Sequence, residues 1–243
     1  MFKTALRTTS LLLPMLAASQ ALAADPPTPP AAFAKLVPVE FSNGLKLVEI
    51  RERCKDCEPW RIIDFHADDS PAPVRQEKVS VVAGVTAMYA FPGTGYFANT
   101  KVERSAAGRY AQDKAIVLEA VTDQCARMKA HVASYVDGHP DVREKLDRAV
   151  AKGKAYVEFE SGSHRGVEYA ACTQNALGLM GGVISELQIF VPQGDTIVTT
   201  YLLQQKKTKF QNIDEFLTLR REFIEGYIDF LQGAEPGGRP DRK

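Results

Sequence analysis

The first 24 residues determine which part of this chain can contribute to a folded domain. Lys3 and Arg7 give a positive start, residues 11–18 are apolar, and the tripeptide 21–23 (Ala-Leu-Ala) is a small-x-small motif before Ala24. This is the pattern of a secretory signal peptide, and its apolar stretch is too short to span a bilayer. We therefore expect cleavage near Ala23 and a periplasmic or secreted mature protein.

The remaining sequence predicts one domain of near-neutral charge. The full chain has 30 basic and 30 acidic residues, and loss of Lys3 and Arg7 with the signal leaves 28 against 30, so the chain has no global electrostatic reason to bind nucleic acid or anionic lipid. After the signal, no apolar run approaches the ~18 residues that a membrane span needs. We expect a domain over 37–232, a Pro-rich leader over 24–36 whose part 25–30 stays outside the core, and a disordered tail over 233–243. No motif for a cofactor is present.

Four cysteines survive signal cleavage and reach an oxidising compartment, where disulfides persist. Of the three connectivities, we favour Cys54–Cys57 with Cys125–Cys172, because Lys55-Asp56 looks like a two-residue hairpin turn. A redox-active Cys-x-x-Cys motif needs its first cysteine at a helix N-terminus. The flanking segments have the pattern of strands instead, so we predict a structural disulfide.

Apolar periodicity predicts strands first, then helices, then strands and a closing helix. Alternation and turn residues give strands over 37–41, 45–52, 60–66, 79–91, 96–103, 154–160, 166–173, 183–191 and 196–204. Spacings of three and four residues give helices over 110–136, 140–152 and 213–232.

This order predicts an α+β fold, an antiparallel β-sheet with two or more long helices packed on it and stapled by disulfides. Cys125 lies in the apolar stripe of the first long helix, and Cys172 lies on a strand. A bond between these two cysteines clamps that helix onto the sheet.

The C-terminal part of the chain also suggests a family. Two hairpin-like strand pairs, including 184–191 and 197–203, lead into a helix with Phe216, Phe223 and Tyr227 on one side. This pattern resembles the PsbP-like (DcrB-type) family of extracytoplasmic α/β/α accessory domains. The resemblance implies a binding or accessory role, because the pattern specifies a shape and no chemistry. The insertion 110–152 and the Cys54–Cys57 turn have no counterpart in that family.

Two clusters of polar residues allow alternative hypotheses. Asp64, His66 and Asp68 alternate along one strand, so their side chains point the same way, as a metal site requires. The simpler interpretation is a strand that runs out into solvent, because two carboxylates and one histidine fall short of a closed site.

The second cluster, Glu158, Glu160 and His164, lies around an expected turn over 161–166 that also contains Ser163. Such a set suits a hydrolase. Ser163 and His164 are sequence neighbours, however, and no Gly-x-Ser-x-Gly elbow is present. The ordinary interpretation is the solvated face of an edge hairpin.

Two apolar connections indicate a contact surface instead. The segment 177–182 carries no charge, and aromatic residues flank the Gly-rich connection 92–95. Apolar loops that stay exposed mark a ligand or protein contact. The residues expected to bind a protein partner are Leu177, Leu179, Met180, Phe91, Tyr96 and Phe97.

The sequence thus favours a non-catalytic binding or accessory protein, of which an inhibitor or immunity-type protein is one class. A periplasmic hydrolase, or a carrier with a small ligand between the sheet and the long helix, is the alternative.

Overall fold

The computed structural model describes residues 26–67, 72–90, 96–137, 143–144, 155–176, 183–204 and 213–233. Seven antiparallel strands form one sheet in the order β1-β4-β5-β9-β8-β7-β6, and β2 and β3 form a separate two-stranded sheet. The strands are β1 (Lys46–Glu52), β2 (Trp60–His66), β3 (Pro73–Ser80), β4 (Ala83–Ala90), β5 (Tyr96–Arg104), β6 (Ala155–His164), β7 (Val167–Ala176), β8 (Val183–Val191) and β9 (Thr196–Gln204).

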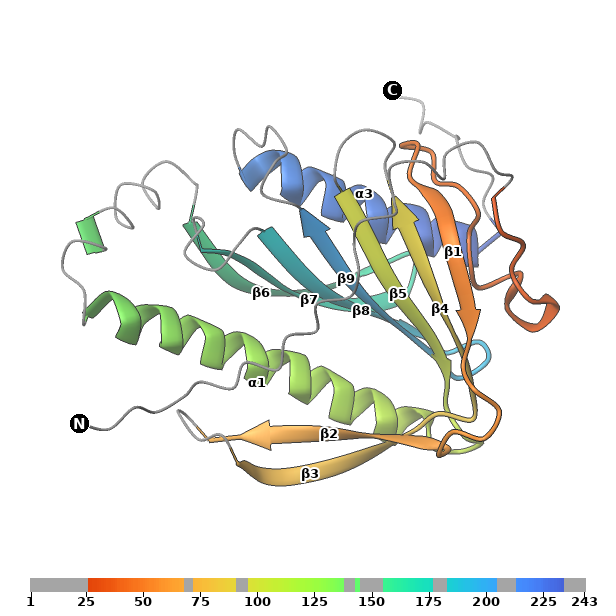
Figure 1. Ribbon diagram of the computed structural model, residues 1–243, viewed down its shortest axis with the longest axis horizontal. Coiled ribbons are helices and arrows are strands. Elements are labelled where there is room, and N and C mark those ends of the chain that lie inside the picture. The colour runs from red at the N-terminus through yellow and green to blue at the C-terminus, as the bar shows by residue number, and fades with distance from the viewer. Residues whose placement is uncertain are drawn as a thin grey trace.

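Two helices cover opposite faces of the large sheet (Figure 1). Helix α3 (Ile213–Leu231) lies on one face, and helix α1 (Tyr110–Asp137) lies on the other, where it packs against β6, β7 and β8. The β2–β3 hairpin packs on the far side of α1. The layers are therefore α3, large sheet, α1 and hairpin.

Each helix buries its own apolar core. Between α3 and the sheet, the ring of Phe41 stacks on Phe223 with centroids 5.0 Å apart and meets Tyr89 edge to face. On the other face, Val121 and Cys125 of α1 pack with Phe65 of the hairpin. Because one stripe of each helix is apolar, each can bury only that stripe against the sheet, which explains the two separate cores.

The predicted α+β class is confirmed: the described residues form an antiparallel sheet covered by the long helices α1 and α3, with two disulfides. The expected helices over 110–136 and 213–232 match α1 and α3 closely. Of the helix expected over 140–152, only residues 143–144 are described, and both are helical. The signal peptide (1–23) lies outside the described residues.

Both disulfides pair as predicted. Cys125 of α1 and Cys172 of β7 are buried and have their Cα atoms 5.5 Å apart, so the bond joins the helix to the sheet. The exposed pair Cys54–Cys57 has Cα atoms 5.4 Å apart.

The setting of Cys54–Cys57 corrects the sequence analysis. The turn that it closes is no hairpin, because β1 pairs with β4 while β2 pairs with β3. The disulfide instead braces the connection between the two sheets.

One strand prediction was wrong. The single strand expected over 79–91 is divided between β3, which ends at Ser80, and β4, which begins at Ala83 in the other sheet. Long-range partners, which local alternation does not encode, decide this division. The expected segments 37–41 and 45–52 do pair with each other, through one bridge between Glu40 and Lys46 and backbone hydrogen bonds from Phe41 to Leu45 and from Leu47 to Val39.

The leader also differs from expectation. Pro29 and Phe33 are buried, and Phe33 belongs to the core beneath α3. A 3-10 turn (Ala31–Phe33) folds the segment back, and the Tyr227 hydroxyl donates a hydrogen bond of 2.6 Å to the Leu36 carbonyl. The core therefore begins before residue 37.

Candidate functional site

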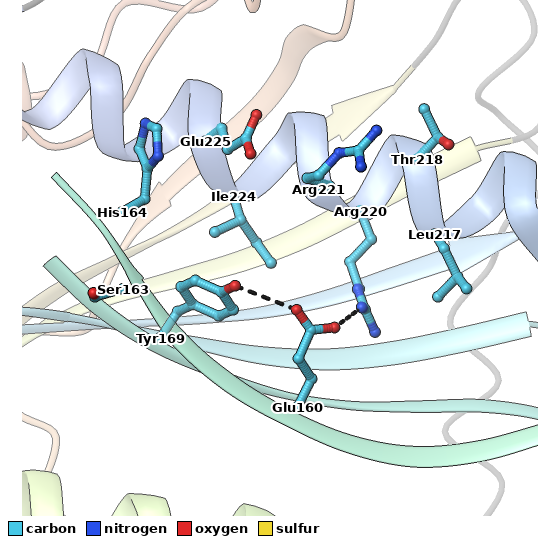
Figure 2. A pocket seen from close by; sticks show the side chains of 10 residues that line it. All are labelled: Glu160, Ser163, His164, Tyr169, Leu217, Thr218, Arg220, Arg221, Ile224 and Glu225. Carbon is cyan, nitrogen blue, oxygen red and sulfur yellow. Dashed lines mark hydrogen bonds and ion pairs between the residues drawn. The ribbon is translucent and has the colours of Figure 1, made fainter.

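A pocket of about 350 Å³ lies between α3, the edge strand β6 and its neighbour β7 (Figure 2). Its polar lining comes from β6 (Glu160, Ser163 and His164), β7 (Tyr169) and α3 (Thr218, Arg220, Arg221 and Glu225). Leu217 and Ile224 give it an apolar part. This is a site at the edge of the sheet, open on one side.

Strand alternation aims the β6 side chains at α3. Glu160, Gly162 and His164 lie two residues apart, so they share one face of the strand. Gly162 is opposite Tyr169 in the ladder, and a Cβ atom there would lie 2.7 Å from the Tyr169 hydroxyl oxygen. The absent side chain at Gly162 therefore lets the Tyr169 ring lie across the strand and reach Glu160.

Arg220 organises the pocket from the helix side. It is only 5% exposed, forms an ion pair with Glu160, and donates a hydrogen bond to the Thr173 hydroxyl. Thr173 is in turn 2.9 Å from the Ser185 hydroxyl. Three strands thus fix one buried guanidinium, whose Nε atom has no hydrogen-bond partner among the described residues.

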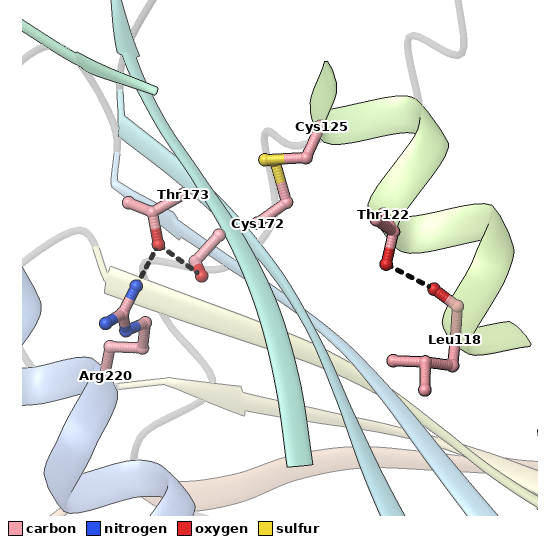
Figure 3. The surroundings of a disulfide bond; sticks show 7 residues. Leu118, Thr122, Cys125, Cys172, Thr173 and Arg220 are labelled. Atoms are coloured by element: carbon pink, nitrogen blue, oxygen red, sulfur yellow. Dashed lines mark hydrogen bonds between the residues drawn. A yellow bond between two sulfur atoms is a disulfide. The ribbon is translucent and has the colours of Figure 1, made fainter. Parts of the chain in front are cut away.

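The same strand carries this network and the buried disulfide on opposite faces. Figure 3 shows Thr173 directed toward Arg220, while the neighbouring Cys172 points to Cys125 of α1. Successive side chains of a strand point to opposite sides. Strand β7 is therefore held from both faces at adjacent residues.

Tyr169 completes the network around Glu160. Its hydroxyl donates a hydrogen bond of 3.2 Å to Glu160 Oε1. Burial, followed by the negative charge of Glu160, raises the pKa of the Tyr169 phenol above its usual range. The hydroxyl therefore keeps its proton at neutral pH and remains a donor.

A second pair of charges closes the end of the pocket near His164. The His164 Nε2 atom is 2.8 Å from Asp229 Oδ1, and the Arg165 Nε atom is also 2.8 Å from that oxygen. Asp229 lies on α3, so this contact ties the end of β6 to the helix. It holds His164 by its Nε2 atom.

The structure brings together only part of the predicted hydrolase set. Glu160 and His164 both line the pocket, whereas Glu158 is exposed and is not part of the lining. Strand β6 continues through Ser163 and His164, where we expected a turn, and the turn comes at Arg165 and Gly166. As successive strand residues, Ser163 and His164 point to opposite sides, so they form no nucleophile–base pair.

The predicted metal ligands lie elsewhere. Asp64 is on β2 and accepts a hydrogen bond of 2.8 Å from Gln76, while His66 ends the strand and Asp68 lies outside the described residues. In the part of the chain that the structure describes, no three His, Cys, Asp or Glu residues gather as a metal site. Since α1 separates the hairpin from the large sheet, Asp64 and Glu160 do not share a site.

Most of the predicted partner-binding residues lie outside the described part of the chain. Phe91, Leu177, Leu179 and Met180 belong to this group. Tyr96 and Phe97 begin β5, and Phe97 is half-buried. The contact surface built from these loops stays a prediction.

Sequence reasoning missed Arg220, Tyr169 and Thr173. A signal for Arg220 was present, because it lies four residues after Phe216 and three before Phe223 on the buried stripe of α3. A charged residue at such a position must find a buried partner. Nothing local indicated that the partner would be Glu160.

Comparisons with models of protein families, with curated proteins and with solved structures find no match for this chain. The resemblance to PsbP-like domains therefore stays a prediction. Within the described residues, neither helix is apolar enough over sufficient length to cross a membrane.

Proposed function

We propose that this protein is a non-catalytic extracytoplasmic binding protein whose pocket between α3 and β6–β7 holds a small polar ligand. One observation carries the proposal: Glu160, Arg220 and His164 of the pocket are each held by another side chain. Glu160 is bound to Arg220 and Tyr169, and His164 is bound to Asp229. Groups fixed in this way are well placed to recognise a ligand. Ser163 and His164 point to opposite sides of β6, so they form no nucleophile–base pair, which favours binding over catalysis.

The lining indicates the chemistry of the ligand. Arg221 and Glu225 are exposed at the pocket and offer opposite charges, and Thr218 adds a hydroxyl. Leu217 and Ile224 offer apolar contact. A pocket of about 350 Å³ is at the small end of the range for ligand sites. We infer a small molecule with both donors and acceptors and a short apolar part.

The test is a ligand screen by thermal shift on the mature, disulfide-bonded protein, followed by calorimetry of each hit. Arg221→Ala removes an exposed lining residue, and Arg51→Ala on β1 is the matched control far from the pocket. A true ligand at about a hundred times its Kd stabilises the fold by about 2.7 kcal/mol. We expect that gain in the wild type and in Arg51→Ala, and a clear loss of affinity in Arg221→Ala.

Two results would contradict the proposal. One is a set of hits whose affinity Arg221→Ala and Thr218→Val both leave unchanged. The other is turnover of a hit by the wild type that Glu160→Gln abolishes, which would restore the hydrolase alternative.

A protein partner is the second candidate, and the outer face of the β2–β3 hairpin favours it. Trp60, Ile62 and Val74 are 36%, 54% and 67% exposed, and alternation places them on the face away from α1. Exposed apolar residues gathered on one face mark contacts. This surface is a candidate for the inhibitor or immunity-type role.

A crosslinked pull-down of the tagged mature protein from the periplasm tests this second candidate. Ile62→Asp charges the hairpin, and Leu179→Asp charges the predicted loop surface. A stoichiometric partner lost in one variant and kept in the other identifies the contact surface. A partner kept in both variants would remove both surfaces from consideration.

A further inference from the structure

The two outer edges of the large sheet, β1 and β6, differ in how well they are protected (Figure 1). Strand β1 has a register shift between Leu47 and Glu49, and the segment 39–41 bonds to part of its outer side. Strand β6 pairs with β7 without a shift over its whole length and contains neither proline nor lysine. In the part of the chain that the structure describes, no strand pairs with the outer side of β6. Bulges, prolines, lysines and covering segments are what normally prevent an edge from pairing with another strand, so β6 is open to such pairing.

The turn after β6 determines which of its backbone groups point outward. Arg165 and Gly166 have φ angles of 46° and 77° and join His164 to its ladder partner Val167, as in a two-residue type I′ hairpin. In such a hairpin the residues that flank the loop exchange both hydrogen bonds, and this exchange recurs at every second pair. The residues of β6 whose amide and carbonyl groups point away from β7 are therefore Val157, Phe159, Ser161 and Ser163.

Like charges disfavour several registers of β6 paired with a second copy of itself. Antiparallel copies of one strand are related by a two-fold axis that passes through one residue of the strand. An axis at Glu158 or Glu160 places a carboxylate opposite itself, and an axis at Phe159 places Glu158 opposite Glu160. Like charges in directly opposed positions destabilise a sheet. The axis therefore lies nearer the turn.

An axis at Ser161 gives the longest pairing without opposed like charges. Ser161 then pairs with itself, and Phe159 pairs with Ser163 of the other copy. These pairs supply about six backbone hydrogen bonds between the copies, whereas an axis at Gly162 supplies about four. Ser161 and Ser163 are both exposed, so their outward groups are accessible to the second copy.

The Ser161 register also brings a carboxylate to a basic cluster. It places Glu158 of one copy opposite His164 of the other, and such opposed residues have Cβ atoms about 5 Å apart. Glu158 is exposed and has no ion-pair partner among the described residues. His164 and the exposed Arg165 share one acid, Asp229. A second carboxylate complements these two basic side chains.

We propose that two copies of this protein pair antiparallel through β6, with Ser161 at the two-fold axis, and that Glu158 of each copy completes the pocket of the other. Glu158 shares the α3 face of β6 with Glu160 and His164, which line the pocket. The three residues that the sequence grouped together are thus assembled from two chains. Completion of the pocket deepens the proposed function, whereas the pairing rests on strand geometry alone. A failed ligand screen therefore leaves the pairing untouched.

Sedimentation velocity of the mature, disulfide-bonded protein tests the pairing. One strand edge is a small interface, so we expect a reversible dimer with a Kd in the micromolar range, measured between about 1 and 300 μM. Ser161→Pro removes an amide that points away from β7 and should leave a monomer. Glu158→Lys places a cation opposite His164 and Arg165 and should raise the Kd about tenfold. Glu52→Lys, an exposed residue at the end of β1, is the matched control and should leave the Kd unchanged.

A cysteine at the axis tests the register. The four native cysteines are paired in two disulfides, so an added thiol reports on contact between copies. Ser161→Cys faces itself with Cα atoms about 5.5 Å apart, a separation that a disulfide spans, and should form a covalent dimer on mild oxidation. Ser163→Cys lies on the same face of β6 but opposite Phe159, so it should stay largely reduced.

Three results would overturn the proposal. The first is a protein that stays monomeric at the highest concentration. The second is a dimer that Ser161→Pro and Glu158→Lys both leave intact, and its loss in Ile62→Asp would place the contact on the β2–β3 hairpin instead. The third is equal cross-linking of Ser161→Cys and Ser163→Cys. Glu158→Lys decides the second result if circular dichroism shows that Ser161→Pro is misfolded.

Discussion

At the scale of single residues, Arg220 and Glu160 are unequal partners. The Arg220 side chain is 7% exposed and that of Glu160 is 41% exposed. Removal of the carboxylate leaves a cation that water cannot reach, whereas removal of the cation leaves a carboxylate that water can solvate. Loss of a partner is costly only where the remaining charge is buried.

We therefore expect Glu160→Ala to lower the free energy of unfolding by about 2–3 kcal/mol and Arg220→Met by about 1 kcal/mol. Methionine fills much of the volume of arginine and needs no partner. The double variant should be no less stable than Arg220→Met, because neither charge is left alone. Urea unfolding of the four proteins measures this cycle. Equal and additive losses would show that the ion pair does not stabilise the fold.

The burial of Glu186 predicts that the free energy of unfolding depends on pH. Burial is the main cause that raises the pKa of its carboxyl above 4.5. The folded state then binds this proton more tightly than the unfolded state, so the contribution of Glu186 to stability falls as the pH rises from 4.5 through the raised pKa. Glu186→Gln should stabilise the protein at pH 7 by about 1 kcal/mol, since no ionised acceptor is left without a donor.

The gain from Glu186→Gln should shrink toward zero as the pH approaches 4.5. Thermal unfolding between pH 4.5 and 8 measures it, with Glu52→Gln as the exposed control. A gain that is constant over this range would contradict the raised pKa.

The sequence allows some of these residues to be found and others not. The stripe of α3 predicts that position 220 is buried, so the need for a partner can be inferred. The partners themselves are 60 residues away at Glu160 and 47 away at Thr173, and nothing in a single sequence links them. The same limit applies to Asn99, Tyr201 and Glu186, which only the pairing of three strands brings into one row.

At the scale of elements, the two disulfides constrain the chain very differently. Cys125–Cys172 spans 47 residues and joins α1 to β7, while Cys54–Cys57 spans 3 residues within a turn. A cross-link stabilises mainly by restricting the unfolded chain, and the effect grows with the length of the closed loop.

We expect Cys125→Ala/Cys172→Ala to cost about 4 kcal/mol and Cys54→Ser/Cys57→Ser about 1–2 kcal/mol by this loop-length argument. Guanidinium unfolding of both double variants measures the difference, and far-UV circular dichroism confirms that each is folded. An equal cost for the two disulfides would show that the clamp of α1 on the sheet adds little.

Elements with a strong local pattern were predictable, and elements that depend on distant partners were not. The apolar stripes of α1 and α3 and the alternation in β8 and β9 gave bounds close to those in the structure. The break between β3 and β4 was missed because Val79 of β3, Val81 of the connection and Val85 of β4 are all buried, although β3 and β4 belong to two sheets. Continuous hydrophobicity hides a change of sheet.

At the scale of the whole molecule, the two faces of the sheet are stabilised in different ways. The α3 side has a large aromatic core that includes Phe41, Tyr89, Phe223 and Tyr227. The α1 side has a smaller core, the Cys125–Cys172 disulfide that joins α1 to the sheet, and the β2–β3 hairpin as an outer layer. The α1 layer therefore depends on the oxidation of its cysteines, and hence on the compartment in which the protein folds.

This dependence links the predicted signal peptide to the stability of the fold. The full chain expressed in a bacterium should be recovered from the periplasm with an intact mass that begins at Ala24 and with no free thiols. The chain that starts at Ala24, made in a reducing cytoplasm, should carry free thiols and lose about 5–6 kcal/mol of unfolding free energy, the sum of the losses in the two cysteine double variants.

Oxidation of the purified cytoplasmic protein should then restore most of that stability, since the structure brings Cys125 and Cys172 together without the signal. Ala21→Leu/Ala23→Leu is the control for cleavage, because it removes the small residues of the motif and should keep residues 1–23 on the chain. If wild-type protein recovered from the periplasm still carried residues 1–23, the predicted signal-peptide cleavage would be wrong. A thiol-containing protein as stable as the oxidised one would contradict the dependence of the α1 layer on its disulfide.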